Sequence, residues 1–300
     1  MFNLHAVTNP WIASQALLAG WATGGADGAR LDLDADITKA YGVRSPKPYP
    51  TTARELMSQA IKGNVGPGQA WAYDSAGNNW VNRLTKVFAA ATKRTPGEVW
   101  ESEFRKPLGL SPGFSWPNAD SVWAFGSAGT CRDYARVGQL LLNAGRWPLD
   151  ADTGTGTGTG NATVQLLPGS FVSALGAPAT RFQPYANYSN RCYGLLTWLN
   201  PEPGSSYPGG CRVPGKSYII PQSSPIAATS LWPAGIPKDS FFAGGANGQI
   251  TLVMPELNTV AVTMGDSTDP LDHGNHDYTA ACLARALCPA LVRNGTGCQM

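Results

Sequence analysis

The stretch Phe242-Ala-Gly-Gly-Ala-Asn247-Gly-Gln249 decides the fold, together with the two runs that follow it. Gln249-Ile-Thr-Leu-Val-Met254 and Thr259-Val-Ala-Val-Thr-Met264 are rich in β-branched residues, which favour strands. The four residues between them, Pro255-Glu-Leu-Asn258, are typical of a tight connection. We therefore predict a β-hairpin that is preceded by a glycine-rich segment.

Helices are predicted before and after this hairpin. Apolar residues spaced three and four apart indicate helices over residues 79–92 and 132–143, and Gly145 supplies a stop for the second. Thr95, Pro96 and Glu98 form a capping signature for another helix. Residues 11–22 and 52–61 also favour helix, and residues 278–291 should form a helix that packs on the sheet. This order of elements predicts an α+β protein.

Composition limits the classes of function. The chain has 300 residues, of which 43% are hydrophobic, so it can build one large domain or two interleaved ones. Its net charge is only +2 and it has no long basic run, so nucleic acid is not an expected partner. The apolar segment 11–21 is interrupted by polar residues and too short to span a bilayer, and it is a poor signal peptide.

Cysteines and glycosylation triplets favour a secreted or lumenal protein, with a cytoplasmic one as the alternative. The six cysteines have no paired zinc-site spacing, so disulfides are the preferred interpretation and six buried thiols the alternative. Cys192 and Cys211 bracket a Pro- and Gly-rich loop and could pair, and one of the last three cysteines could reach Cys131. The three triplets that would accept a glycan begin at Asn161, Asn187 and Asn294.

Four stretches, in their order along the chain, resemble the serine β-lactamase-like family, which includes class C β-lactamases and penicillin-binding proteins. They are residues 28–34, 67–77, 126–143 and 242–249. The resemblance implies an antiparallel sheet flanked by helices plus a helical subdomain, with the N-terminal part of the fold truncated. Residues 1–31 would be a remnant of the nucleophile-helix region, residues 32–185 the helical subdomain with a Thr/Gly-rich insertion at 153–160, and residues 186–300 the sheet region with a C-terminal helix.

The resemblance also implies a reaction and a set of site residues. The reaction is hydrolysis of an amide, ester or lactam in a small-molecule or peptide-like substrate, by way of an acyl-enzyme. Tyr73 matches the family's catalytic tyrosine, although an aromatic anchor is an alternative role, and Ser75 stands where relatives have an Asn. Asn247, Gly248 and Gln249 resemble the Gly-Gln ending of the third motif and would bind substrate.

The nucleophile motif of the family is absent from the sequence. No Ser or Thr stands three positions before a Lys. Ser14 is the hydroxyl nearest to the expected position, but Leu17 follows it at the place of the lysine and cannot accept a proton. Two interpretations stay open: a serine hydrolase whose nucleophile helix lies outside this chain, or a noncatalytic relative that uses the site to bind a ligand or a protein partner.

A metal centre is the remaining chemical possibility. His273 and His276 lie among four aspartates, but the spacing lacks the Glu and the helix of the zinc-protease motif. Pro270 and Gly274 indicate a solvated loop instead. We therefore expect neither a metal nor an organic cofactor.

Overall fold

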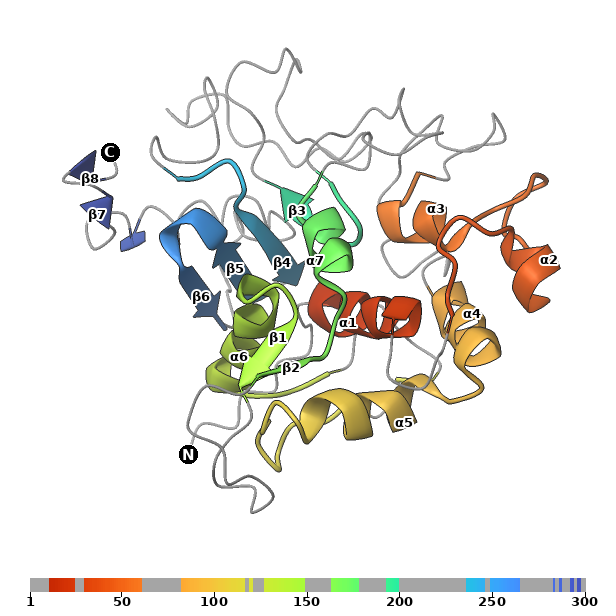
Figure 1. Cartoon of the computed structure of the whole chain (residues 1–300), viewed down its shortest axis with the longest axis horizontal. Coiled ribbons are helices and arrows are strands. Elements are labelled where there is room, and N and C mark those ends of the chain that lie inside the picture. Colours follow the sequence, from red (N-terminus) through yellow and green to blue (C-terminus); the bar gives the residue numbers. More distant parts are fainter. Residues whose placement is uncertain are drawn as a thin grey trace, which may run out of the picture.

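The described part of the computed structural model contains helices and a four-stranded sheet (Figure 1). The described residues are 11–24, 30–60, 82–116, 119–120, 127–148, 163–177, 193–199, 236–245, 249–264, 283, 286–287, 292–293 and 296–297.

A four-stranded antiparallel sheet forms one side of the molecule. Its strands are β3 (Trp198–Leu199), β4 (Phe241–Gly245), β5 (Gln249–Met254) and β6 (Thr259–Thr263), hydrogen-bonded in that order. In the register, Phe242 lies opposite Leu252 and Leu252 lies opposite Ala261. The short 3-10 helix Pro255–Leu257 joins β5 to β6, and Asn258 ends it with a φ of 48°. The predicted hairpin is therefore confirmed.

Seven α-helices are described. They are α1 (Trp11–Gly24), α2 (Ile37–Tyr41), α3 (Ala53–Ser58), α4 (Arg83–Thr92), α5 (Pro96–Val99), α6 (Cys131–Leu142) and α7 (Gly169–Leu175). Two short antiparallel pairs complete the described elements, β1 (Arg146–Pro148) with β2 (Thr163–Gln165) and β7 (Val292–Arg293) with β8 (Thr296–Gly297). In the predicted C-terminal helix, Leu283 and Leu287 are helical and pack against the core.

The structure confirms the predicted cap of α5 and the predicted stop of α6. The hydroxyl of Thr95 accepts from the Glu98 amide at 3.2 Å, and the Glu98 carboxylate accepts from the Thr95 amide at 2.9 Å, which is the predicted capping box. Gly145 follows α6 with a φ of 82°. One detail differs: after α5 the chain continues as a π-helix, Trp100–Arg105, in which the rings of Trp100 and Phe104 stack at 5.7 Å.

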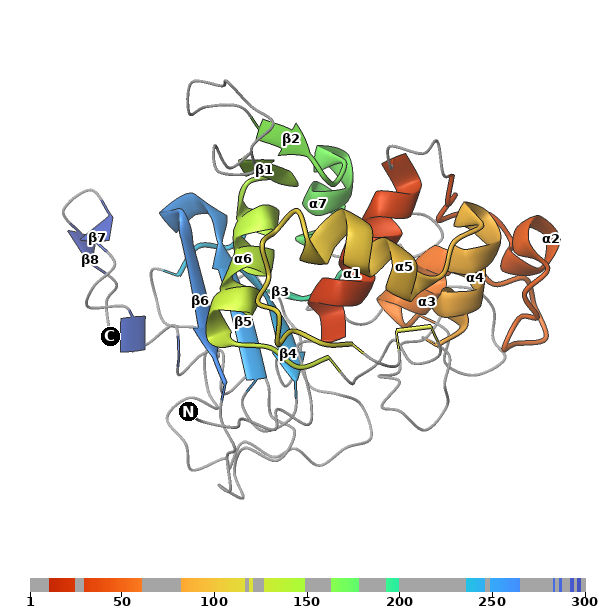
Figure 2. The same ribbon diagram turned by 90° about the horizontal axis from the view of Figure 1, so that it is seen from below.

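One face of the sheet carries α1, α6 and α7. A Cβ on Gly138 of α6 would meet Val260 and Thr251, and one on Gly176, just after α7, would meet Phe241. Helix α1 packs along β4. In both views, α2, α3 and α4 lie on the far side of α1 from the sheet (Figures 1 and 2).

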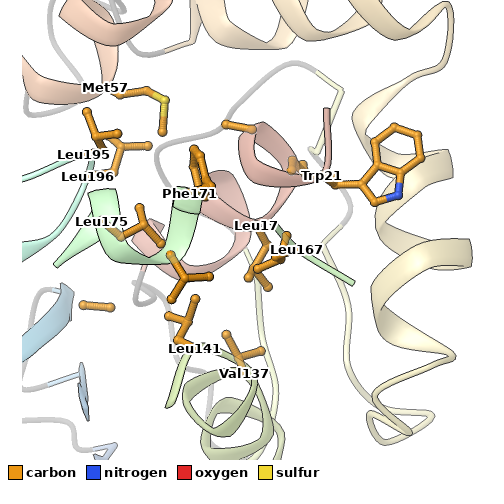
Figure 3. Packing of buried hydrophobic residues seen from close by; sticks show 14 of the residues in the cluster. Leu17, Trp21, Met57, Val137, Leu141, Leu167, Phe171, Leu175, Leu195 and Leu196 are labelled. Atoms are coloured by element: carbon orange, nitrogen blue, oxygen red, sulfur yellow. The ribbon is translucent and has the colours of Figure 1, made fainter. Parts of the chain in front are cut away.

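Helix α1 is the centre of the packing. Its sequence is apolar on nearly every side, which is the pattern of a buried helix, and Leu17 and Leu18 are fully buried. Helix α7 fits closely against it because a Cβ on Gly20 would lie only 2.6 Å from the Phe171 ring. Side chains from α1, α6 and α7 point into one shared interior (Figure 3). In the described part of the chain, no helix has the length and apolar character needed to cross a membrane.

Candidate functional site

The end of β4 lies where α1 meets the β4–β5 pair. Helix α1 contacts α7 in the C-terminal half of α1, at Gly20. Helix α7 ends beside Phe241, at the start of β4. The first turns of α1 therefore lie toward the other end of β4, at Gly244 and Gly245. Figures 1 and 2 both show this end of β4 beside one end of α1. The start of β5 lies there too, because Gln249 pairs with Gly245.

The side chains of α1 offer little chemistry to this place. The helix contains no Asp, Glu, Lys, Arg or His. Its two hydroxyl residues are Ser14 in the first turn and Thr23 in the last, where the Thr23 hydroxyl donates to the Gly20 carbonyl at 2.7 Å. The sequence of α1 therefore contains a hydroxyl residue in its first turn, Ser14, but no group that could accept a proton from it.

The strands beside α1 are also uncharged. In β4, Ala243 is buried directly before Gly244 and Gly245, so this segment supplies no charged side chain. Gln249, the one predicted substrate-binding residue that is described, is 3% exposed at the first position of β5. Thr251, two residues on, is buried, and its Oγ1 has no hydrogen-bond partner among the described residues.

A buried pair of hydroxyls stands near the beginning of α6. The oxygens of Ser127 and Tyr134 lie 3.0 Å apart, and both side chains are 1% exposed. Burial raises the pKa of Tyr134 to about 12, the hydrogen bond to Ser127 opposes this, and the charge of Asp133 adds to it. Tyr134 is therefore protonated at neutral pH and cannot act as a base. Tyr134 belongs to the predicted helix 132–143, but no sequence pattern indicates Ser127 as its partner.

Asp133 fastens the beginning of α6 to the preceding loop. Its carboxylate accepts from the Ser111 amide at 2.7 Å and the Ser111 hydroxyl at 2.8 Å. It also accepts from the Thr130 amide and hydroxyl, both at 2.8 Å. Burial tends to raise the pKa of Asp133, but these hydrogen bonds outweigh it and the pKa is lowered. The carboxylate is thus ionised and fully engaged, which makes it a structural clamp.

A second buried connection joins the helices to the edge of the sheet. The Gln59 Nε2 donates to the Tyr193 hydroxyl at 2.9 Å, and the Leu196 amide donates to the Met57 carbonyl at 2.9 Å. Gln59 and Leu196 have φ values of 58° and 59°. The connection holds α3 against the turn that precedes β3, the neighbour of β4. Gln59 and Tyr193 are separated by 134 positions in the sequence, so no local pattern indicates that they bond to one another.

Solved structures share this arrangement over nearly the whole chain. A β-lactamase from Mycobacterium bovis matches with a TM-score of 0.60 and 14% identity, over 96% of this chain and 87% of that one. A penicillin-binding protein homologue from Caulobacter crescentus matches at 0.55 and 14%, over 94% and 83%. The simvastatin synthase of Aspergillus terreus matches at 0.57 and 13%, over 93% and 83%. This chain has the serine β-lactamase-like fold.

The predicted fold class is therefore confirmed, with helices and an antiparallel sheet in the expected combination. At the level of sequence, no protein-family model and no curated protein matches the chain. The three solved structures are a β-lactamase, a penicillin-binding protein homologue and a simvastatin synthase, so the shared fold alone does not identify a reaction for this chain.

Several predicted site residues lie outside the described part of the serine β-lactamase-like fold. These are Tyr73, Ser75, Asn247, Gly248 and the three glycan acceptors Asn161, Asn187 and Asn294. Their roles stay predictions, as do the proposed subdomain boundaries. Ser14 is described only as a position in the first turn of α1.

Cys131 is the first residue of α6, where its thiol is exposed and unpaired. The C-terminal cysteines, one of which we expect could reach it, lie outside the described residues, so the pairing stays a prediction. The other five cysteines and the cluster around His273 lie outside the described residues. Among the described residues, no three His, Cys, Asp or Glu side chains are grouped so as to hold a metal.

Proposed function

We propose that this chain is a β-lactamase-related serine hydrolase domain that binds an acyl ligand at the end of β4 without turning it over. The observation that carries the proposal is the composition of α1, which packs along β4 and has no ionisable side chain. Attack of a serine on an amide, ester or lactam carbonyl needs a neighbouring base. With Leu17 three residues after Ser14, that base is missing from the helix.

Hydrogen bonds that order α3 and α6 support a role in ligand binding. The Asp133 clamp orders the beginning of α6, and the Gln59–Tyr193 hydrogen bond holds α3 to the turn before β3. Connections of this kind hold α3, α6 and the turn before β3 in fixed positions, and such preorganisation lowers the entropic cost of binding a ligand. The alternative is a hydrolase whose nucleophile is supplied from outside these 300 residues.

A fluorescent penicillin and a p-nitrophenyl ester distinguish these functions. The chain and its Ser14→Ala variant are incubated with each compound, and binding is followed by fluorescence anisotropy, adducts by intact mass and turnover by nitrophenol release. We expect saturable binding to both proteins, with no adduct and no release. A covalent adduct on the unmodified chain contradicts the proposal, and its loss in Ser14→Ala would identify Ser14 as the nucleophile. Absence of any saturable binding also contradicts it.

A further inference from the structure

Two neighbouring helices at one end of the molecule carry a group of basic side chains. Helices α2 and α4 contact each other on the far side of α1 from the sheet (Figures 1 and 2). Residues 37–54 and 82–97, which include the two helices, contain no Asp or Glu. Five basic residues of these segments form no ion pair within the described part of the chain, and we call them the basic patch: Lys39, Arg44, Arg83, Lys86 and Lys93.

The geometry of α4 places three cations of the basic patch on one side of the helix. At about 100° per residue, Arg83, Lys86 and Lys93 fall within an arc of about 80°. Lys86 and Lys93 are exposed on this side, whereas Phe88 on the opposite side is fully buried. Lys93 directly follows the helix, and its Nζ donates to the Ala90 carbonyl at 2.8 Å. The ammonium group is thereby held over the same side.

The segment after α2 adds further cations to the basic patch. The Arg83 Nη1 donates to the Arg44 carbonyl at 2.7 Å, so the start of α4 lies against a residue whose own side chain is exposed. Lys39 in α2 is exposed as well. Like charges that gather in this way repel each other and slightly destabilise the folded state. An anionic partner would remove that repulsion.

Acidic residues near the two helices contact other groups. Asp34, before α2, binds Arg54 at 2.6 Å, and Asp36 caps α2. After α4, Arg94 pairs with Glu103 at 3.0 Å. These carboxylates therefore neutralise or cap neighbours of the basic patch, and its own cations are directed to solvent.

We propose that the basic patch docks on an anionic phospholipid bilayer. A Lys or Arg held near such a surface strengthens binding by about fivefold. The attraction falls off within a Debye length of about 10 Å, so a planar surface acts on the end of the molecule that faces it and little on acidic residues elsewhere. The docking surface is separate from the end of β4 and does not depend on the proposed function.

Nucleic acid is the other polyanion that attracts basic side chains. Its binding depends on a series of phosphate contacts along the strand. The chain has no long basic run and a net charge of only +2, which is unfavourable for such a partner. A bilayer is the better match for cations that project from two helices at one end, because its charge lies in a plane.

Vesicle sedimentation tests the proposal. The chain is mixed with vesicles of phosphatidylcholine, or of phosphatidylcholine and phosphatidylglycerol in equal amounts, at low and at physiological salt. We expect binding to the anionic vesicles only, and weaker binding at the higher salt. Lys39→Gln/Arg44→Gln/Lys86→Gln should weaken it at least about tenfold. Lys39→Arg/Lys86→Arg, which keeps both charges, should preserve it.

A matched variant separates the position of the charges from the net charge. Lys106→Gln/Arg132→Gln/Lys238→Gln also removes three exposed cations, but from places outside α2 and α4. It should change vesicle binding by less than about twofold. Circular dichroism verifies that each variant is folded.

Four results would overturn the proposal. They are no binding to anionic vesicles, equal binding to neutral ones, and an equal loss in the matched variant. The fourth is tighter binding of a short RNA duplex than of the vesicles through the same cations, which would assign the basic patch to nucleic acid.

Discussion

Gly138 sets how closely α6 approaches the sheet, and Gly138→Ala tests that packing. A Cβ at this position would lie 2.5 Å from Val260 Cγ1 and 3.1 Å from Thr251 Cγ2. Overpacking of this kind costs about 1–3 kcal/mol, because a valine in a strand has few other rotamers. Alanine is better than glycine inside a helix by about 1 kcal/mol. A 2.5 Å contact with Val260 places the overpacking cost in the upper part of that range, about 2–3 kcal/mol, so we expect a net loss of about 1–2 kcal/mol in the free energy of unfolding.

Val260→Ala removes the side chain that the new methyl group would strike. In that background, Gly138→Ala should be neutral or stabilising by up to about 1 kcal/mol, because the helix propensity then acts alone. The double-mutant cycle should therefore give a coupling of about 2 kcal/mol between the two positions. Urea unfolding followed by tryptophan fluorescence and circular dichroism measures each variant.

Gly113→Ala is the matched control, because a Cβ there meets no atom within 4 Å. It should be neutral or slightly stabilising. If Gly138→Ala unfolds at the same urea concentration as the unmodified chain, the helix and sheet are not in the tight contact described. An identical cost in the Val260→Ala background would also refute the reasoning.

Three further predictions concern the connections around the site. Gly194→Ala should destabilise the chain by more than about 2 kcal/mol in urea unfolding, since its Cβ would strike the backbone carbonyl of Leu175, which cannot rotate away. The pKa of Asp133 is lowered on folding, so its contribution to stability is complete above the unfolded pKa of about 3.9 and is lost as pH falls through the folded value; Asp133→Asn should flatten that part of the stability profile. Tyr193→Phe should cost about 1 kcal/mol by removing the acceptor of the Gln59 amide, and an unchanged unfolding midpoint would contradict this.

Local patterns predicted the elements of this fold well. The periodicity of residues 132–143 and the glycine after them gave α6 to within one residue at each end. The hairpin of β5 and β6 follows from two β-rich runs and one tight connection. These features depend on neighbours in sequence, so a single sequence contains the information that specifies them.

Connections between distant residues were not predictable in the same way. The hydroxyl of Tyr193 gives no sign that it bonds to Gln59, and β3 has only two residues, too few for a periodic pattern. The exposed position of Cys131 depends on how the whole helix packs. The resemblance of four motif segments supplied the global arrangement instead, and the shared fold of the solved structures confirms it.

The central position of α1 has a consequence for biosynthesis. This helix ends at Gly24 and is translated long before the strand it packs along, β4, which begins only at Phe241. At about 5–20 residues per second, the ribosome needs roughly 10–40 s to reach that strand. During this interval an apolar helix, with Leu17 and Leu18 among its residues, lacks the sheet that later buries it. Expression of the chain should therefore depend on chaperones that hold its first residues until the last third has emerged.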